Sequence, residues 1–193
     1  MPRLVFFTGH SGAGKTTLSK RAVPLLHART GESFAFLDKD TLYGGYSAQV
    51  MRLLTGDPDD RDSPTFLDNL REPEYDGLLA VARENLEIGV NVVACAPFSR
   101  EVKSGRLFDA AALGLPEATR ITVVWLTLDE AEARRRIEAR AHPRDRYKLA
   151  HWDEYRVRRF EPSAADHPQM LLHDTTRDDA ARLSELIEAI AAR

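Results

Sequence analysis

Residues 9–16 read GHSGAGKT, and the types and spacing of these residues suit the binding of phosphate groups. Glycine allows backbone conformations and close approaches that a side chain would forbid, so the three glycines can form a loop whose N–H groups converge on an anion. Lys15 and Thr16 follow where a helix should begin, and the positive end of a helix dipole attracts the same anion. In the matching pattern G-x-x-x-x-G-K-[ST], the lysine reaches the β- and γ-phosphates and the hydroxyl binds Mg²⁺.

This stretch predicts a nucleotide site with ATP and Mg²⁺ as cofactors. A chance glycine-rich turn is the alternative, but an apolar, strand-like run precedes the stretch and a helix-like pattern follows it. Lys15 is the predicted catalytic cation of the loop, and Thr16 is a predicted metal ligand. The residues predicted to contact the nucleotide here are Gly9, His10, Ser11, Gly12, Ala13, Gly14, Lys15, Thr16 and Thr17.

A second pattern is the pair of acids in FLDKDTLYGG, residues 36–45. Asp38 and Asp40 follow a strand-like run, and open α/β sheets bind ligands beyond the carboxyl ends of their strands. Carboxylates there could hold Mg²⁺ through water and accept the proton of a substrate hydroxyl. Capping of the next helix is the alternative for Asp40. Beside a phosphate loop we expect at least one of the two acids to be catalytic, and Asp38 is the predicted metal ligand.

A third pattern is the basic stretch EARRRIEARAHPRDRYK, residues 132–148. Its arginines at helical spacing share a face with Glu132, and further cations follow in a looser segment. A charged helix face is usually only solvated, and that interpretation suffices for Arg134. Phosphoryl transfer, however, needs positioned cations, because negative charge spreads over the transferred group. We therefore expect a lid over ATP at about residues 134–150. The cations in this cluster are Arg136, Arg140, Arg144, Arg146 and Lys148.

Cys95 ends the apolar run VVAC and is interpreted as a small buried hydrophobe. Nothing near it in the sequence argues for a reactive thiolate. The segment that follows, residues 98–106, is expected to lie over the pocket for a phosphate acceptor.

The composition predicts one domain over residues 1–193, long enough to bury a core. The formal net charge is −3, and no lysine run indicates a polyanion partner. The single cysteine excludes an internal disulfide and agrees with a reducing compartment. The first residues show no long apolar segment with a small-residue cleavage site, so we expect no secretory leader, and the sequence has no apolar run of roughly 20 residues. We expect a cytoplasmic protein without membrane contact, as a monomer or homodimer.

Strand-like and helix-like segments alternate along the chain, which is typical of an α/β fold. Near-continuous apolar strands indicate a parallel sheet with helices on both faces. Pro24 should kink or shorten the helix that follows the glycine loop. Residues 41–88 are interpreted as a helical insertion over the ligand edge of the sheet. The predicted strands are residues 3–8, 33–37, 90–96, 121–126 and 169–173.

Together these motifs make the chain resemble the small P-loop kinases. That group contains polynucleotide kinase, zeta toxin, gluconate kinase, adenylylsulfate kinase and chloramphenicol phosphotransferase. The resemblance covers nearly the whole chain, and its first motif is the one most specific for a nucleotide. The motifs that carry it are GHSGAGKT, LDKD, EYDGLLAVARENLEIGVNVV, RRRIEARAHPRD and LLHDTT.

The resemblance implies a three-layer α/β/α fold with a five-stranded parallel sheet of order 2-3-1-4-5. It also implies MgATP as the donor and a hydroxyl group as the acceptor. Within the acid pair it favours Asp40 over Asp38 as the base. In the lid it favours Arg140 and Arg144 as the arginines around the transferred phosphate. The segment after LLHDTT often passes the adenine in this group, which implies that residues 174–177, with Thr176 among them, line that base.

Two departures from the group affect these implications. Many relatives carry an aspartate where this chain has Cys95, so Mg²⁺ binding would fall to Thr16 and to one of the two acids near residue 40. Polynucleotide kinases often carry an arginine where this chain has Tyr43, which weakens the prediction of a nucleic-acid acceptor.

The predicted function is an ATP-dependent kinase for the hydroxyl of a small molecule. The alternatives are a polynucleotide or tRNA 5′-hydroxyl kinase and a nucleotide-dependent regulatory ATPase. Against a regulatory switch, the chain lacks N-K-x-D and D-x-x-G elements.

The choice of a small acceptor depends on charge and on aromatic residues. The acidic loop GDPDDRDSP, residues 56–64, should repel a phosphate backbone. Aromatic residues could wall a compact, partly apolar pocket, and these are Tyr43, Tyr46, Phe66, Tyr75 and Phe98. Cations that would favour a polyanion if they lined one groove are Arg52, Arg61, Arg71, Arg100, Lys103 and Arg106.

Overall fold

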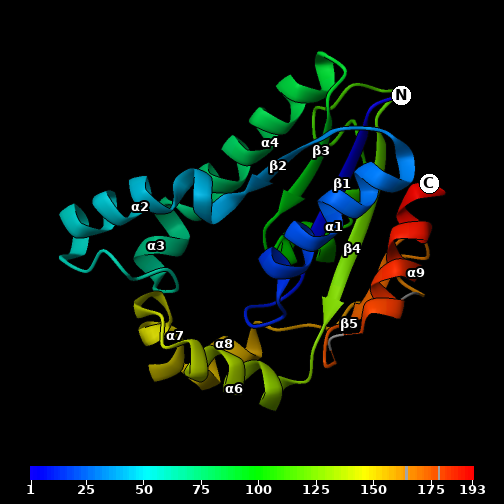
Figure 1. Ribbon diagram of the computed structural model, residues 1–193. Coiled ribbons are helices and arrows are strands. Elements are labelled where there is room, and N and C mark those ends of the chain that lie inside the picture. Colours follow the sequence, from blue (N-terminus) through cyan, green and yellow to red (C-terminus); the bar gives the residue numbers. More distant parts are fainter. Residues whose placement is uncertain (164, 178) are drawn as a thin grey trace.

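The chain forms a layered α/β structure, seen in a computed structural model that describes residues 1–163, 165–177 and 179–193 (Figure 1). The strands are β1 (Arg3–Thr8), β2 (Phe34–Asp38), β3 (Asn91–Cys95), β4 (Arg120–Thr127) and β5 (Leu171–Asp174). The α-helices are α1 (Lys15–Thr30), α2 (Lys39–Thr55), α3 (Pro64–Asn69), α4 (Arg71–Glu87), α5 (Ser99–Lys103), α6 (Glu130–Arg140), α7 (Arg146–Ala150), α8 (Trp152–Val157) and α9 (Ala180–Ala191). Short 3-10 turns are η1 (Arg106–Phe108) and η2 (Pro143–Asp145).

Among the described residues, the strands form one five-stranded parallel sheet in the order β2-β3-β1-β4-β5. This order and the three-layer α/β/α arrangement confirm the predicted fold class. The register aligns the carboxyl ends of neighbouring strands, since Cys95 pairs with both Phe7 and Asp38. The residues that follow β1, β2 and β3 therefore meet at one edge of the sheet.

Strand β1 shows how the sheet separates two helical layers. Leu4 and Phe6 point to one face, where they pack in a buried cluster with Leu78 of α4. Val5 and Phe7 point to the other face, into a cluster that contains buried residues of α1 and α9. Alternate residues of a strand point to opposite faces, so an all-apolar strand is what a sheet covered on both sides requires.

The loop between β1 and α1 depends on glycine for close packing. Gly9 has a φ of 128°, and a Cβ there would lie 2.7 Å from the carbonyl oxygen of Leu126 in β4. Gly12 has a φ of 87°, and a Cβ there would lie 2.9 Å from the carbonyl oxygen of Ala133 in α6. Any side chain at either position would collide with backbone and also adopt an unfavourable conformation. The loop is thereby pressed against β4 and α6.

Helix α1 is longer than the sequence predicts, because it continues through Pro24 to Thr30. Of the two predicted effects of Pro24, a kink or a shortening, the shortening is therefore wrong, and the kink stays a prediction. Proline removes one helical N–H and so leaves one carbonyl without its partner. Pro24 is exposed, so this carbonyl lies on the side of the helix that water can reach.

The predicted insertion at residues 41–88 has two structurally different parts. Helices α2 and α3 project beyond the sheet and are called the arm below (Figure 1). Their own small core consists of the buried Met51, Phe66 and Leu70. Helix α4 instead covers one face of the sheet, where its Leu78 is fully buried. Only the arm thus has the position expected of an insertion at the ligand edge.

Helices α6, α7 and α8 form a second projection, called the lid below. Ile137 of α6 packs with Trp152 and Tyr155 of α8, so the lid has its own apolar contacts. The lid and the arm extend from the same edge of the sheet (Figure 1). No helix among the described residues is long and apolar enough to cross a membrane.

Candidate active site

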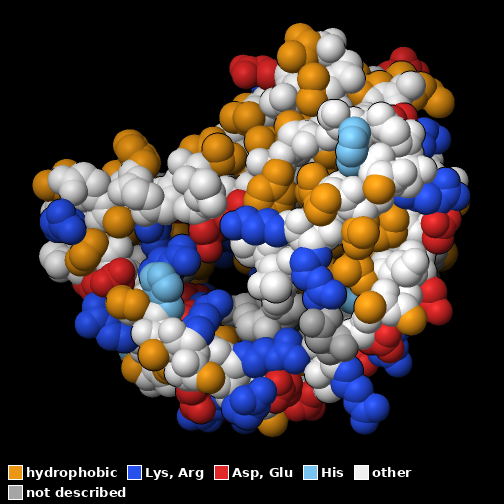
Figure 2. Space-filling view, viewed as in Figure 1, with side chains coloured by type: hydrophobic (Ala, Val, Ile, Leu, Met, Phe, Trp, Pro, Cys, Tyr) orange, Lys and Arg blue, Asp and Glu red, His pale blue; other side chains and the backbone are white. Residues whose placement is uncertain are grey.

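A cleft of about 590 Å³ opens where the glycine loop, the arm, α5 and the lid meet. Figure 2 shows the hollow between arm and lid, with Lys and Arg side chains gathered around it. Of the side chains that line the cleft, eleven are Lys or Arg and four are Asp. This excess of positive charge suits an anionic ligand.

Lys15 occupies the centre of the glycine loop. Its Nζ donates a hydrogen bond of 2.9 Å to the backbone oxygen of His10, so the side chain bends back over the loop. Burial lowers the pKa of Lys15 to about 8. Gly14, at the N-terminus of α1, has no side-chain cap, which leaves N–H groups of the first turn directed at the cleft. The structure thus places a buried cation and free N–H donors together.

Thr16 and Asp38 are brought together as predicted. The Thr16 hydroxyl donates a hydrogen bond of 2.8 Å to Oδ2 of Asp38. The other oxygen, Oδ1, accepts the backbone N–H groups of Asp40 and Thr41 at 2.9 and 3.2 Å, so Asp38 is the N-cap of α2. Both oxygens of this buried carboxylate are therefore used to join α1 to α2.

The oxygens of Thr16 and Asp38 fit the donor set for Mg²⁺. This ion prefers oxygen ligands and usually binds through one or two carboxylates, the substrate phosphates and water. Cys95 lies nearby, with its Sγ 3.7 Å from the Thr16 hydroxyl oxygen. Burial, together with the charge of Asp38, raises the pKa of the Cys95 thiol to about 11, so it stays neutral. A neutral thiol is a poor ligand for this hard cation.

Asp40 lines the cleft and is held by two cations. Lys39 Nζ lies 3.0 Å from Oδ1 of Asp40, and Arg144 of the lid lies 3.1 Å from Oδ2. Enclosure in the cleft alone would raise the pKa of Asp40, but Lys39 and Arg144 outweigh it and lower the pKa far below its usual value. Asp40 is thus a permanent carboxylate that connects the arm to the lid.

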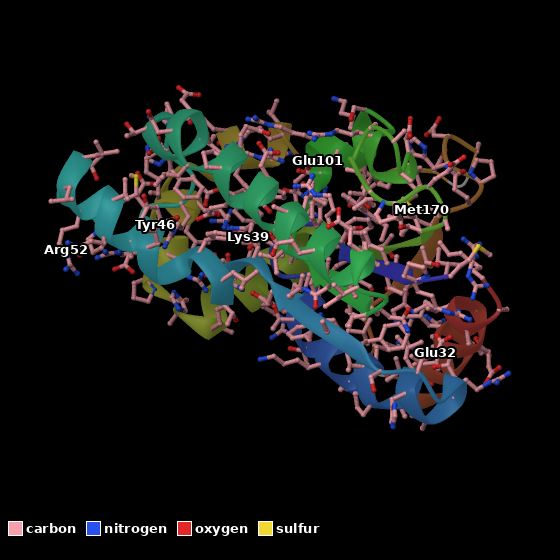
Figure 3. All side chains as sticks on the ribbon, turned by 90° about the horizontal axis from the view of Figure 1, so that it is seen from above. Glu32, Lys39, Tyr46, Arg52, Glu101 and Met170 are labelled. Carbon is pink, nitrogen blue, oxygen red and sulfur yellow. The ribbon has the colours of Figure 1, made fainter. Side chains whose placement is uncertain are left out.

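Lys39 is itself fixed by a buried network under the arm. It pairs with Glu74 of α4, and Ser47 also donates to Glu74 at 2.5 Å. Arg61 reaches the same carboxylate at 3.3 Å. Figure 3 shows Lys39 at the start of α2 close to α4. Glu74 therefore anchors the cations that face the cleft from the arm.

The lid contacts the glycine loop through Ser11. Arg140 forms a bidentate pair with Asp145, both distances being 2.6 Å, and also donates to the Ser11 hydroxyl at 3.2 Å. Lys148 reaches the same hydroxyl at 3.3 Å. The Ser11 backbone N–H donates to the Tyr155 hydroxyl at 3.2 Å. The lid cations are thus positioned directly over the loop.

The acidic loop at residues 56–64 does not face the cleft as free negative charge. Asp57 and Asp59 lie 3.6 and 3.5 Å from Arg146 of the lid. Asp62 lies 3.1 Å from Lys148. These carboxylates pair with lid cations, so the loop offers less free negative charge than the sequence predicts, and its repulsion of a phosphate backbone stays a prediction.

The walls near α5 also differ from the partly apolar pocket expected from the sequence. Phe66 and Tyr75 line the cleft, but Phe98 is fully buried in the core, and Tyr46 lies exposed on the outer part of α2 (Figure 3). Tyr43 packs against the core cluster of α4. Among the cations named from the sequence, Arg52 and Arg106 lie outside the cleft. Those that line it are Arg61, Arg71, Arg100 and Lys103.

Several predicted nucleotide residues lie behind the lining of the cleft. Ala13 is buried, and its N–H donates to the backbone oxygen of His10 at 3.3 Å. Gly9 donates to the backbone oxygen of Pro97 at 3.3 Å. Arg136 is also outside the cleft, where it donates to the backbone oxygens of residues 175 and 176 at 2.9 and 3.3 Å. Arg136 and Thr176 are therefore brought together, next to the lid but apart from the lining residues.

Sequence reasoning missed several residues that shape the site. Lys39 lies between the two acids of LDKD, and the pattern of these acids alone does not predict its role. Asp145 is part of a basic run, where a lone acid could have indicated an internal ion pair. Glu74, Tyr155 and Arg159 carried no sequence signal, since their partners lie far away in the chain.

The AAA domain family, AAA_33, matches residues 4–162 of the chain. No curated protein matches this chain. Among the solved structures that are similar to this chain, three are informative. The APS kinase CysC of Mycobacterium tuberculosis, in complex with AMPPNP and APS, has a TM-score of 0.59 at 21% identity, covering 98% of this chain and 97% of that one. Kti12 of Chaetomium thermophilum, in complex with ADP-AlF3, has a TM-score of 0.64 at 20% identity. The match covers 98% of this chain and 97% of that one.

The third structure is a gluconokinase of Sinorhizobium meliloti, with a TM-score of 0.55 at 17% identity, covering 99% of this chain and 90% of that one. Identities this low show a common fold, and the resemblance to small P-loop kinases is confirmed at that level. The family match includes the glycine loop, the acid pair and the lid. The chain belongs to the AAA domain family AAA_33 and has the fold of the small P-loop kinases.

Proposed function

We propose that this protein is an ATP-dependent kinase that transfers the γ-phosphoryl group to a hydroxyl of a small molecule. The observation that carries the proposal is the arrangement around Lys15, where free N–H groups, the Asp38–Thr16 pair and lid cations surround one cleft. The structures with similar folds include an APS kinase and a gluconokinase, which supports a small acceptor.

Binding of the triphosphate would use the glycine loop and the start of α1. The loop N–H groups and the dipole of α1 stabilise the phosphate charge, and Lys15 contacts the β- and γ-phosphates. Thr16 and Asp38 would hold Mg²⁺, which supplies charge neutralisation at the phosphate oxygens when bound. Arg136 and Thr176, which lie together beside the lid, are proposed to contact the adenine side of the nucleotide.

In the transfer step, the acceptor oxygen forms a bond to the γ-phosphorus while the bond from that phosphorus to the β–γ bridging oxygen breaks. The electron pair of the broken bond leaves with ADP. Asp40 accepts a hydrogen bond from the acceptor hydroxyl and takes its proton as the new ester forms. Its low pKa makes it a weak base, so its main role is to orient the hydroxyl. In a loose transition state the acceptor hydroxyl has transferred little of its proton, so a weak base is sufficient.

Arg140 and Arg144 would stabilise the charge that develops on the transferred group. Both arginines line the cleft and are paired with carboxylates, Arg140 with Asp145 and Arg144 with Asp40. These pairs hold the guanidinium groups in place before the substrate binds. Preorganised cations of this kind stabilise a transition state without reorganisation at the moment of reaction.

The proposal is tested by measuring ADP formation from MgATP with a panel of sugars, sugar acids, nucleosides and aminoglycosides. Oligonucleotides with a 5′-hydroxyl and a reaction without acceptor complete the panel. We expect turnover with a small acceptor and none in Lys15→Met, which keeps the side-chain volume but removes the cation. Transfer to oligonucleotides alone would support a polynucleotide kinase, and rapid ATP hydrolysis that no acceptor stimulates would support a regulatory ATPase. Either result would contradict the proposed function.

The two acids should respond differently to neutral substitutions. Asp40→Asn should reduce kcat by about 10²- to 10⁴-fold while MgATP binding persists, because the orientation of the hydroxyl and the ion pair with Arg144 are lost but the glycine loop is unchanged. Asp38→Asn should instead weaken binding of MgATP, because the Thr16 pair and the metal ligand are affected. Steady-state kinetics and calorimetric binding measure both effects. A normal kcat in Asp40→Asn, with turnover lost in Asp38→Asn at unchanged nucleotide affinity, would reverse the assignment.

Removal of a lid arginine should lower kcat more than it raises KM. For Arg140→Ala or Arg144→Ala we expect a decrease of about 10²- to 10³-fold in kcat, as for other groups whose contacts strengthen in the transition state. Arg135→Ala is the matched control, because Arg135 is exposed on α6 and pairs with Glu132. If the control and the two lid variants showed equal activity, the lid arginines would be ordinary solvated side chains.

A further inference from the structure

Three basic residues that line the cleft are not among the cations used above. Arg100 and Lys103 belong to α5, while Arg159 follows α8. The proposed mechanism gives these residues no role. Two of them, Lys103 and Arg159, have N–H donors without a hydrogen-bond partner among the described residues.

Arg159 is a buried cation with an unused donor. Its side chain is only 9% exposed. Nη2 donates to the backbone oxygen of Leu128 at 3.2 Å and lies 3.5 Å from Oε1 of Glu161. Nη1 is buried and has no hydrogen-bond partner among the described residues. A buried N–H without an acceptor costs free energy, so an acceptor oxygen from a ligand would be favourable at this position.

The position of Arg159 is fixed relative to the glycine loop. The next residue is Phe160, whose backbone oxygen lies 2.6 Å from Nε2 of His10. The backbone nitrogen of Phe160 lies 3.1 Å from the same ring atom. The His10 ring also packs edge-on against Trp125 and Phe160. Arg159 is thus held beside the loop by its own neighbour in the chain, and it does not need a ligand to be positioned.

Lys103 faces the cleft from a rigid support. Across the described residues it forms no hydrogen bond and no ion pair, although it lines the cleft. The turn before α5 is fixed by Phe98, which is fully buried with a φ of 48° and packs edge-on against Phe6 and Tyr75 at 5.0 Å. Glu101 of α5 forms a buried bidentate pair with Arg71.

The acids that line the cleft do not neutralise Lys103 and Arg159. Asp38 bonds to Thr16, and Asp40 pairs with cations of the arm and the lid. Asp62 pairs with Lys148, and Asp145 pairs with Arg140. Arg159 has one carboxylate beside it, that of Glu161 outside the cleft lining, but its Nη1 and the ammonium group of Lys103 remain available to a bound molecule.

We propose that the acceptor carries an oxyanion, a phosphate, sulfate or carboxylate, in addition to its reactive hydroxyl. Lys103 and Arg159 bind this oxyanion. The inference rests on the proposed kinase function for the role of the bound molecule. The cleft of about 590 Å³ must hold both donor and acceptor, which favours a small acidic compound over a polymer.

The first test asks whether an oxyanion binds while the nucleotide site is filled. Inorganic phosphate is titrated into the protein saturated with Mg²⁺ and AMPPNP, and the heat of binding is measured. We expect saturable binding that weakens by about tenfold or more in Arg159→Gln and in Lys103→Gln. Arg106→Gln is the matched control, because Arg106 lies near α5 but outside the cleft. Lys103 is exposed, so its variant should fold even if Arg159→Gln does not.

The second test compares acceptors that differ in one charged group, with glucose against gluconate and glycerol against glycerol 3-phosphate. We expect kcat/KM to be at least about tenfold higher for the acidic member, and this preference should disappear in Lys103→Gln. Comparison of the carboxylate and phosphate pairs identifies which oxyanion the site prefers.

The outcomes separate the two proposals. Phosphate binding above AMPPNP without transfer to any acceptor would support the oxyanion site and contradict the kinase function. Transfer with equal rates for neutral and acidic members would support the kinase function and overturn the oxyanion site. Absence of saturable phosphate binding, unchanged affinity in Lys103→Gln, or transfer to oligonucleotides alone would also overturn it.

Discussion

The carboxylate of Asp38 is the constraint on which the cleft depends. One oxygen accepts the Thr16 hydroxyl, at the start of the helix that follows the glycine loop. The other caps α2, which begins the arm. The parallel register places this side chain opposite Cys95, at the point where β1, β2 and β3 all end. A single buried acid thus fixes the arm relative to the phosphate loop, and Lys39 and Asp40 take their positions from that helix start.

A second level of organisation is the balance of charge between arm and lid. Arm carboxylates pair with lid cations, as in the contacts of Asp62 with Lys148 and of Asp40 with Arg144. Partly exposed pairs such as the second contribute little to stability individually, but they determine which cations face the cleft. Near α5, Arg100 pairs with Glu72, which lies outside the cleft lining, and Lys103 has no ion pair among the described residues, so the two sides of the cleft differ in the charge they offer to a ligand. Under the proposed function, these two sides would bind the donor and the acceptor.

The fold was largely predictable because its signals are local. Apolar runs separated by helical patterns predict a covered parallel sheet, and the spacing of GHSGAGKT predicts the loop that β1 and α1 form around Lys15. The proximity of Thr16 and Asp38 was also predictable, since both follow strands that end at the same edge. Ion pairs between segments that are distant in the sequence could not be predicted. Lys148 and Asp62 are separated in sequence by β3 and β4, so the ion pair that joins the acidic loop to the lid could not be predicted. Pro24 shows the same limit, because exposure on one helix side is a tertiary property.

The most direct test of a triphosphate contact at Lys15 is the number of protons taken up when AMPPNP and Mg²⁺ bind. Burial lowers the pKa of Lys15 to about 8 in the ligand-free protein, and a bound phosphate would raise it again. Titration calorimetry at pH 8 in buffers of different ionisation enthalpy should therefore detect uptake of about half a proton. This uptake should be absent in Lys15→Met, and it should shrink in the wild type below pH 7. Tight binding with equal proton uptake in both proteins would contradict the assignment of Lys15 to the nucleotide phosphates.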